Sequence, residues 1–450
     1  MNININIGVN QGVININSVE FTGNSSESAG NARDREDKEK NVVWEQTEET
    51  TREKREDIVV VGDKEINNKA TFPETEALAE EKEIPIVIKQ QQKDKNIDVG
   101  VESNAVHPQE VEEIAMQILE EIQEIYTPKK RDNVFLSKIY IELYNEYERG
   151  KGGSYYVNKS ERMYYCGSFL AYEVNKRGEK RLIKTSTCHI RLCPMCMWRR
   201  ALKAYREMRI VYSYVQKETE NSKFLFLTLT QRNVEADKLG KELDRILYGF
   251  MRLMQRKEIK KFCLGFVRSL EITYNKKTNT YHPHIHILIH TTSKLYAGRN
   301  YLSKQDYIRL WRELLCLDYD PSVNIKQFKP KDVNRVGKEL AEICKYSVKP
   351  SDYIYIDDEE LTKKVTEVLD KYLAGRRLLS YGGTIRKARK ELLFSDEITE
   401  SDDIIAREDV QADEQGYIEL YKWHFGEEKY KRLSGEERES MLKFVEKKGV

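Results

Sequence analysis

Four of the seven histidines in this chain fall within the stretch His282-Pro-His-Ile-His-Ile-Leu-Ile-His290. Successive side chains of a β-strand point to opposite faces, so all four histidines would share one face and the isoleucines between them the other. We therefore predict a strand with an apolar face in the core and a histidine face directed away from it. Two imidazoles that are two residues apart on a strand can converge on one divalent ion, so His284 and His286 are candidate metal ligands, with His282 as a third.

The strand that precedes this segment offers an oxygen ligand. The two strands, Leu264–Tyr274 and Tyr281–His290, are joined by the polar turn-like stretch 275–280, which predicts an antiparallel hairpin. If Tyr274 pairs with Tyr281, Glu271 lies opposite His284 on the same face. Two histidines and a carboxylate with open positions can hold Mg²⁺ or Mn²⁺ and still admit a phosphate oxygen.

A predicted helix at about 332–347 carries three reactive groups on its polar face. At 100° per residue, Glu342, Tyr346 and Lys349 lie opposite the apolar side chains, and Pro350 ends the helix. A tyrosine is a poor nucleophile because its pKa is near 10. Beside a metal-bound phosphodiester and a lysine that stabilises the phenolate, Tyr346 could attack phosphorus covalently.

Four cysteines form a pattern typical of zinc sites. The segment Cys188-His-Ile-Arg-Leu-Cys193-Pro-Met-Cys196 contains a C-x-x-C pair, and Cys166 completes a set of four thiols. His189 could replace one of them, and a redox-active pair is the alternative to zinc. We interpret the other cysteines of the chain as core thiols. Directly after this cluster, Arg199, Lys203 and Arg206 share one face of a helix that could follow DNA phosphates.

Charge is distributed unevenly along the chain, although the net charge is only +1. Residues 1–130 carry 15 basic and 28 acidic groups, and residues 396–450 carry 9 and 16. Residues 131–395 carry 52 and 31, the charge pattern of a core that binds a polyanion. With a mean hydropathy of −0.70 and no long apolar run, we expect no membrane span, and the lack of a signal peptide predicts a cytoplasmic protein.

These patterns predict an α+β fold with a central antiparallel sheet and flanking helices. A small zinc-binding segment and a largely disordered N-terminal extension would precede it. We divide the chain into an acidic extension with one possible helix (1–130), a zinc-binding and basic-helix region (131–215), a catalytic domain (220–395) and an acidic C-terminal tail (396–450). Within the extension, residues 1–17 alternate Asn with Ile or Val, which suits a strand.

Three motifs resemble those of the HUH endonucleases, and in particular of the replication initiator (Rep) proteins of small rolling-circle plasmids. They are FLTLT at 226–230, HPHIHILI at 282–289 and KYSVK at 345–349, in the family's order. The segment TCHIRLCPMCMWRR at 187–200 resembles the zinc-like segment of a large subgroup with one catalytic tyrosine. RRLLSYGG, which begins with Arg376 and Arg377, resembles that subgroup's C-terminal segment and suggests further DNA contacts.

The resemblance covers about 155–395 and implies nicking of one strand at a plasmid double-strand origin in a bacterium. It implies that His284 and His286 bind the metal, that Tyr346 becomes 5′-phosphotyrosyl, and that Lys349 is the lysine of the tyrosine motif. Glu342 matches a carboxylate associated with termination. Single-stranded and double-stranded origin DNA, a host helicase and a host DNA polymerase would be the partners. The oligomeric state is left open.

Two other interpretations are open at this stage. An HUH transposase or conjugative relaxase would use the same chemistry, but relaxases usually carry their tyrosine before the histidines, whereas here it follows them. A zinc-containing DNA-binding regulator without enzymatic activity would leave the histidine strand unexplained.

Overall fold

A computed structural model describes residues 2–10, 13–22, 108–147, 154–296, 301–327, 333–395 and 416–447. The chain divides into two compact units, Met1–Asn68 and Lys69–Val450. In the first unit, β1 (Asn2–Asn10) and β2 (Val13–Thr22) pair antiparallel. The stretch 1–17, predicted to suit a strand, therefore contributes to both strands of a hairpin. Most of the stretch 20–105, which we predicted to be disordered, lies outside the described residues.

The second unit contains a five-stranded sheet in which every neighbouring pair is antiparallel. The strand order is β8-β5-β7-β6-β9. Its members are β5 (Ser222–Thr230), β6 (Gly265–Asn275), β7 (Thr280–Thr292), β8 (Val323–Gln327) and β9 (Leu379–Gly382).

The predicted hairpin register is confirmed. Tyr274 pairs with Tyr281, and Glu271 lies directly opposite His284. The turn between β6 and β7 is closed by Asn275, whose side-chain oxygen accepts hydrogen bonds from the backbone amides of Lys277 and Thr278. A short polar side chain that bonds its own turn fixes the register, because it sets where the two strands begin to pair.

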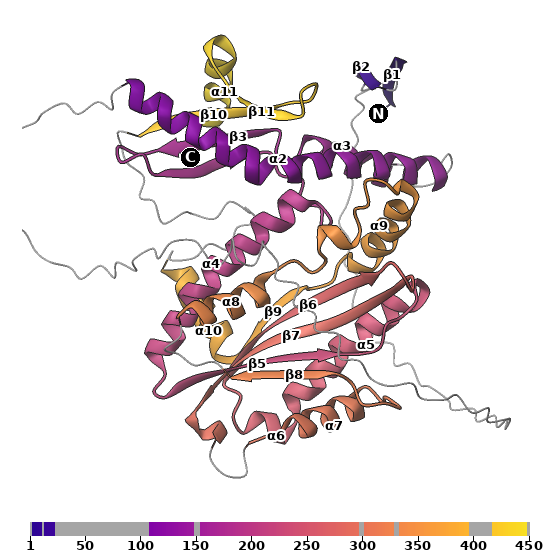
Figure 1. Cartoon of the computed structure of the whole chain (residues 1–450), viewed down its shortest axis with the longest axis vertical. Coiled ribbons are helices and arrows are strands. Elements are labelled where there is room, and N and C mark those ends of the chain that lie inside the picture. The colour runs from indigo at the N-terminus through magenta and orange to yellow at the C-terminus, as the bar shows by residue number, and fades with distance from the viewer. Residues whose placement is uncertain are drawn as a thin grey trace, which may run out of the picture. The chain divides into compact units, whose positions relative to one another are not determined.

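Helices cover both faces of this sheet. The isoleucine face of β7 packs against α5 (Ala236–Gln255) and α7 (Lys304–Leu314), as the alternation predicts. The histidine face is directed toward α4 (Pro194–Glu218), α8 (Val333–Cys344) and α10 (Gly383–Phe394), which pack on Leu288 and Phe226. Figure 1 shows the strands between these two groups of helices. The histidine strand is therefore central, and its polar groups lie under α8.

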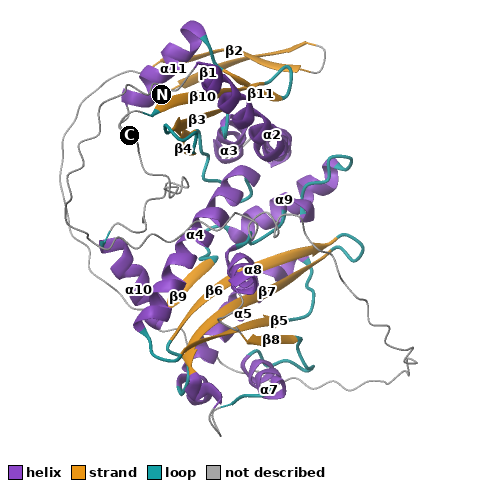
Figure 2. Ribbon diagram, turned by 60° about the vertical axis from the view of Figure 1, so that its left-hand side comes forward, coloured by secondary structure: helices purple, strands orange, loops and turns teal. Residues whose placement is uncertain are grey.

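Residues assigned to an acidic C-terminal tail are part of a second sheet. It has the order β11-β10-β3-β4, so β10 (Tyr417–His424) pairs with β3 (Phe169–Val174). The other strands are β4 (Lys180–Thr185) and β11 (Lys429–Arg432), and α11 (Gly435–Lys447) packs on Leu420 and Ala171. The net negative charge of 396–450 concealed the alternation Tyr417-Ile-Glu-Leu-Tyr-Lys-Trp423, which is typical of a strand. Figure 2 shows this second sheet apart from the five-stranded sheet.

The one possible helix of the acidic extension belongs to a much longer helix that runs through Pro128. The helix α2 spans Pro108–Tyr147 with Pro128 inside it. Proline costs a helix about 3 kcal/mol, but Ile118 and Ile122 before it and Leu136 and Ile139 after it are buried in the same core. Burial on both sides of the proline outweighs that cost. Because α2 crosses position 130, the predicted boundary there falls inside a helix.

The remaining elements of the described residues are α3 (Ser154–Tyr165), α6 (Lys257–Lys260), α9 (Glu359–Leu373) and the short 3₁₀ helices η1 (Ser293–Tyr296) and η3 (Pro350–Asp352). The predicted α+β class, with an antiparallel sheet, flanking helices and a cysteine cluster upstream, is confirmed. No helix in the described part of the chain combines the length and apolar character needed to cross a bilayer.

Candidate metal centre and active site

Three predicted metal ligands, His284, His286 and Glu271, converge on one point. The Nε2 atoms of His284 and His286 lie 3.0 and 2.8 Å from Glu271 Oε2. The three ligand atoms lie within 4.8 Å of one another, and the Glu271 side chain is 2% exposed. An unprotonated imidazole nitrogen and a carboxylate oxygen are both acceptors, so they can stay this close only with a cation or a proton between them. The group could therefore hold a metal ion.

The other ring nitrogen of each histidine is already engaged. His284 Nδ1 lies 3.3 Å from the backbone oxygen of His282, and His286 Nδ1 lies 3.1 Å from Thr228 Oγ1. Because a carbonyl oxygen only accepts, His284 can donate from Nδ1, which leaves the Nε2 lone pair available to a metal ion bound beside Glu271. The Thr228 hydroxyl can accept from His286 in the same way. Contacts of this kind orient a histidine for metal binding.

Lys345 and Glu342 border this group. The Lys345 ammonium lies 2.7 Å from Glu271 Oε2 and 2.5 Å from Glu342 Oε1, and Glu342 Oε1 lies 3.5 Å from His286 Nε2. Burial by itself would raise the pKa of Glu271, but the two histidines and Lys345 outweigh it and hold that pKa well below its usual range. Glu271 is therefore ionised and ready to bind a cation.

Tyr346 lies just beyond α8 and not within a helix as predicted. The helix ends at Cys344 because the chain then turns to β6, where the Ile272 amide donates to the Ser347 carbonyl at 2.7 Å. The two neighbours of Tyr346 are thus held to consecutive β6 residues, Lys345 to Glu271 and Ser347 to Ile272. The half-buried Tyr346 therefore lies between two residues that are bound to β6 at Glu271 and Ile272. We refer to residues 345–353 as the tyrosine segment.

Lys349 and Tyr353 occupy the far end of the tyrosine segment. Lys349 precedes η3, and its positive charge lies near the Asp352 carboxyl, whose pKa is raised to about 6 chiefly by burial. Tyr353, the nearest rival nucleophile, is completely buried, and its hydroxyl donates to the Leu192 carbonyl at 2.7 Å. Tyr353 is therefore inaccessible to a DNA phosphate.

The other two histidines of β7 lie outside the group of three. His290 is bonded through Nδ1 to Thr384 Oγ1 at 2.7 Å and through Nε2 to Ser222 Oγ at 3.1 Å. Burial lowers the pKa of His290 to about 4, so it is a neutral core residue at pH 7. His282 is half-buried and is not part of the group, so a metal-binding role for it remains a prediction.

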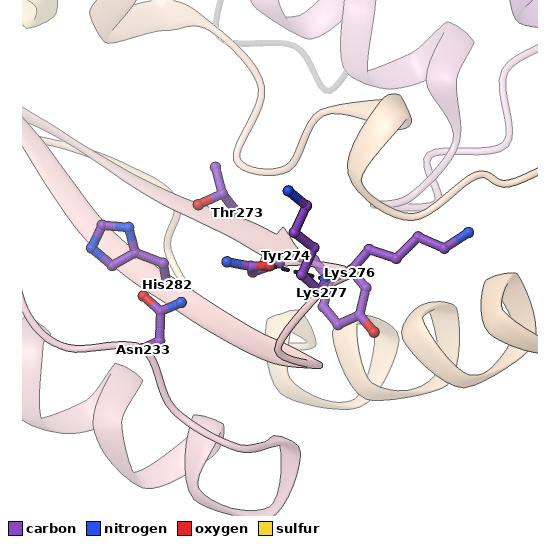
Figure 3. Close-up of a pocket in the computed structure, with 7 residues that line it drawn as sticks. Asn233, Thr273, Tyr274, Lys276, Lys277 and His282 are labelled. Carbon is purple, nitrogen blue, oxygen red and sulfur yellow. Dashed lines mark hydrogen bonds between the residues drawn. The ribbon is translucent and has the colours of Figure 1, made fainter. Parts of the chain in front are cut away.

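A polar groove runs from His282 along the end of the hairpin (Figure 3). Lys276 and Lys277 on the turn lie at one end of it, and Asn233 lies beside His282 at the other. Lys276 lies 3.4 Å from Asp358, and Asn233 donates to Thr280 at 3.0 Å. The groove therefore joins the edge of the metal centre to a positively charged turn.

The four predicted zinc ligands form one cluster. Cys166 Sγ lies 3.5 Å from the Sγ atoms of both Cys193 and Cys196, and Cys188 Sγ lies 3.6 Å from that of Cys196. With Zn–S bonds near 2.3 Å, the edges of a ZnS₄ tetrahedron measure about 3.8 Å. The four thiols, each at most 1% exposed, therefore fit a tetrahedral ion with little adjustment.

The local sequence builds this cluster. Cys193 is the N-cap of α4 and Pro194 follows it, while the Cys196 amide donates to Cys193 Sγ at 3.4 Å. His189 is exposed, has a positive φ of 56° and contacts Thr187, so it is not among the clustered ligands. The three other cysteines differ: Cys344 is buried and Cys263 partly buried, but Cys316 is exposed where the chain leaves α7, contrary to its prediction as a core thiol.

A buried lysine accompanies the thiols. Lys130 is 0% exposed, and its ammonium donates to the Cys166 carbonyl at 2.9 Å and to the Tyr164 carbonyl at 2.5 Å. Burial lowers the pKa of Lys130 to about 8, against the opposing effect of the thiols. A positive charge here would offset part of the double negative charge of a zinc ion with four thiolates.

The predicted DNA-binding face of α4 is turned inward. Arg199 is 3% exposed and donates to the Tyr126 hydroxyl at 3.3 Å, so the prediction that it contacts DNA is wrong. Lys203 pairs with the buried Glu207 at 3.9 Å, and one terminal nitrogen of Arg206 is buried as well. The pattern of charges along α4 does not reveal that α2 and α8 pack on this helix.

Arg376 and Arg377 have different surroundings. Arg376 is bound to α5 through the Gly240 carbonyl at 3.1 Å and through Asp244, and its contact with DNA remains a prediction. Arg377 is exposed, and its carbonyl accepts from Arg268 at 3.0 Å. Of this pair, only Arg377 presents its side chain to the solvent.

Three residues around these two clusters are not predicted from the sequence. Thr228 lies within FLTLT and pairs with His286 across β5 and β7, so the spacing of the two motifs could have indicated it. Lys345 follows Glu342 by three residues, one helical turn, and its position just before Tyr346 was a second signal. For Lys130, which meets the cysteines only in three dimensions, the sequence contains no signal.

Comparison with known proteins identifies the family. A family model described as "Replication protein" matches residues 179–431, a range that includes the metal centre, α4 and β10. A curated "Protein rep" of Bacillus amyloliquefaciens is 33% identical over 326 residues, which are 68% of this chain and 94% of the relative.

Other relatives agree with this assignment. A "Protein rep" of Streptococcus pneumoniae serotype 2 is 38% identical over 256 residues (55% of this chain, 76% of the relative). One from Staphylococcus aureus is 35% identical over 233 residues (51% and 95%). No solved structure matches the chain. The chain thus belongs to the replication (Rep) protein family, and its resemblance to the initiators of plasmid rolling-circle replication is confirmed.

Proposed function

We propose that this initiator is a metal-dependent nickase that cuts one strand at the plasmid's double-strand origin, with Tyr346 as the nucleophile. The observation that carries the proposal is the attachment of both neighbours of Tyr346 to β6, at Glu271 and Ile272. A nucleophile next to a metal-bound phosphate needs such fixed placement, because orientation supplies a large part of the rate.

The reaction follows from the groups present. The Tyr346 hydroxyl gives its proton to water and its oxygen attacks phosphorus. The bond from phosphorus to the 3′ oxygen breaks, and the 3′ oxygen takes up a proton from water and leaves as a hydroxyl. The phosphotyrosine retains the 5′ end, and the free 3′-OH primes DNA synthesis. A divalent cation, Mg²⁺ or Mn²⁺, held by His284, His286 and Glu271, would polarise a non-bridging phosphate oxygen. Lys349 supplies positive charge that favours the phenolate form of the tyrosine.

The DNA partner is inferred from charge and from the groove beside His282. The basic excess of residues 131–395 suits a polyanion, and Lys276 and Lys277 place two amines at the end of the hairpin. We infer that the strand next to the scissile phosphate lies in this groove. Duplex and single-stranded origin DNA are both substrates in this scheme, in the bacterial cytoplasm, where a host helicase and polymerase extend the 3′ end.

Metal dependence is tested by nicking of supercoiled plasmid that carries the origin. Either His284→Ala or His286→Ala should abolish nicking in Mg²⁺ or Mn²⁺ but leave duplex binding largely intact, since basic surface residues supply the phosphate contacts. The matched control is His424→Ala, at a histidine that is 50% exposed on β10. Undiminished cleavage by both variants in chelator-treated buffer would refute the proposal.

The nucleophile is tested by covalent trapping. Tyr346→Phe should lose the denaturation-resistant DNA adduct and retain DNA binding, whereas Tyr248→Phe, at a tyrosine 64% exposed on α5, should form the adduct normally. Peptide sequencing of the wild-type adduct should locate it at Tyr346. An adduct on any other tyrosine would disprove the assignment.

A further inference from the structure

The tyrosine segment is attached at both ends, and its far end reaches the cysteine cluster. Its first end is bound to β6 beside the metal centre through Lys345 and Ser347. At the other end, Tyr353 is 0% exposed and donates to the Leu192 carbonyl at 2.7 Å. Leu192 is itself buried and lies between the cluster residues Cys188 and Cys193.

The chain between these two attachments has little freedom. Val348 is 1% exposed in the main core. The turn at η3 is closed by hydrogen bonds from the Asp352 amide to the Lys349 carbonyl at 2.9 Å and from the Ile354 amide to the Pro350 carbonyl at 2.8 Å. A displacement at Leu192 is therefore transmitted along the segment, because buried and hydrogen-bonded residues cannot absorb it locally.

The cluster side of this contact is held equally firmly. Asn133 on α2 contacts Cys193 Sγ at 3.1 Å, and Lys130 on the same helix donates to the Cys166 carbonyl at 2.9 Å. Arg162 on α3 donates to the Cys188 carbonyl. The Leu192 carbonyl therefore belongs to a rigid loop whose shape is set by the four thiols and the ion that they fit.

From these contacts we infer that Tyr353 is a positioning residue, through which the zinc-loaded cysteine cluster holds Tyr346 in place for attack. The cluster then acts on the nicking step itself, in addition to any role in folding. The inference rests on the proposed nicking function. It explains why a tyrosine, and not an apolar residue, fills this core position: only a hydroxyl can reach the Leu192 carbonyl.

The test compares Tyr353→Phe with Tyr421→Phe in the full chain. Tyr421 is the matched control because it is 0% exposed and donates to a backbone carbonyl, that of Ala115, at 2.8 Å. Native mass spectrometry should find one zinc in each variant. Hydrogen exchange of residues 345–353 should be about fivefold faster in Tyr353→Phe, as expected for the loss of one hydrogen bond, and unchanged in Tyr421→Phe.

Activity and zinc removal supply the other measurements. With a single-stranded origin oligonucleotide, Tyr353→Phe should form the adduct about tenfold more slowly at saturation with an unchanged KM, since orientation is lost but binding is not. Extraction of zinc from the wild type, followed by resupply of Mg²⁺, should make hydrogen exchange in residues 345–353 at least as fast as in Tyr353→Phe.

Two outcomes would overturn the inference. One is exchange in 345–353 that is the same in Tyr353→Phe and in the control, and the other is exchange in the wild type that does not respond to zinc removal. A wild-type protein that forms no adduct would refute the proposed function instead, and the exchange comparison would still decide whether the cluster holds the segment.

Discussion

Replacement of Glu271 by glutamine should destabilise the metal-free protein and abolish its binding of Mn²⁺. Glu271 is 2% exposed and contacts the Lys345 ammonium at 2.7 Å. Removal of one partner of a buried ion pair costs about 3–5 kcal/mol. Lys345 also contacts Glu342 at 2.5 Å, and the Glu342 side chain is 29% exposed, so Lys345 keeps one partner in the variant. We therefore expect a loss of unfolding free energy at the lower end of this range, about 3 kcal/mol.

The metal provides the second part of this test. At a Mn²⁺ concentration of 100 times Kd, binding should stabilise the wild type by about 2.7 kcal/mol, and Glu271→Gln should lack this gain. Urea unfolding with and without Mn²⁺ measures both quantities. Glu427→Gln, at an exposed acid on the β10–β11 turn, should behave as wild type. Equal stabilisation of Glu271→Gln and the wild type by Mn²⁺ would show that Glu271 is not a ligand.

The low pKa of Glu271 in the folded state fixes how the free energy of unfolding depends on pH. The folded state holds the pKa of Glu271 well below its usual range, so protonation of this group favours unfolding. Its contribution is complete above the unfolded-state pKa, about 4.3, and is lost as the pH falls through the lower folded-state pKa. The stability difference between the wild type and Glu271→Gln in chelator should therefore be constant near neutrality and shrink only below about pH 4.

Three further predictions concern the other groups. Native mass spectrometry should find one Zn²⁺ per chain, which Cys193→Ser should lose together with the fold of 155–210; a metal-free but fully folded wild type would contradict this. The Glu342→Ala variant should initiate replication almost normally but terminate it poorly, because the carboxylate can act as general base on water. A two-origin plasmid should then give multimeric displaced strands. Normal termination with failed initiation would assign Glu342 to the metal instead. Burial lowers the pKa of His290 to about 4, so between pH 6.5 and 4 only the unfolded state takes up a proton at this residue, and the wild type should lose roughly 3 kcal/mol of unfolding free energy. In His290→Gln, the unfolding free energy measured in urea should vary less with pH over this range. The same pH dependence in both proteins would refute the assignment.

The grouping of Glu271, His284 and His286 could be predicted from the sequence because strand alternation and one turn decide it. Once Asn275 fixes the turn, Glu271 must lie opposite His284, and the period of two brings His286 to the same face. The cluster of four thiols could be predicted equally well, because a zinc site requires a small set of ligand types at short spacing.

Predictions failed where tertiary contacts oppose a local pattern. The helix before Tyr346 ends early because β6 offers a partner for the Ser347 carbonyl, and nothing in the local sequence reveals that strand. Arg199 is charged yet buried, since α2 covers the side of α4 that the charge pattern assigned to DNA. Pro128 normally ends a helix, but the apolar residues on both sides of it share one core.

The pairing of β10 with β3 also has a consequence for synthesis on the ribosome. β3 emerges well before β10, and at about 5–20 residues per second the interval between them is on the order of 10–50 s. Throughout that interval the edge of β3 that β10 will occupy has unpaired amide and carbonyl groups, which can template pairing with other chains. In a nascent chain of this initiator, that edge of β3 therefore stays open until β10 is made.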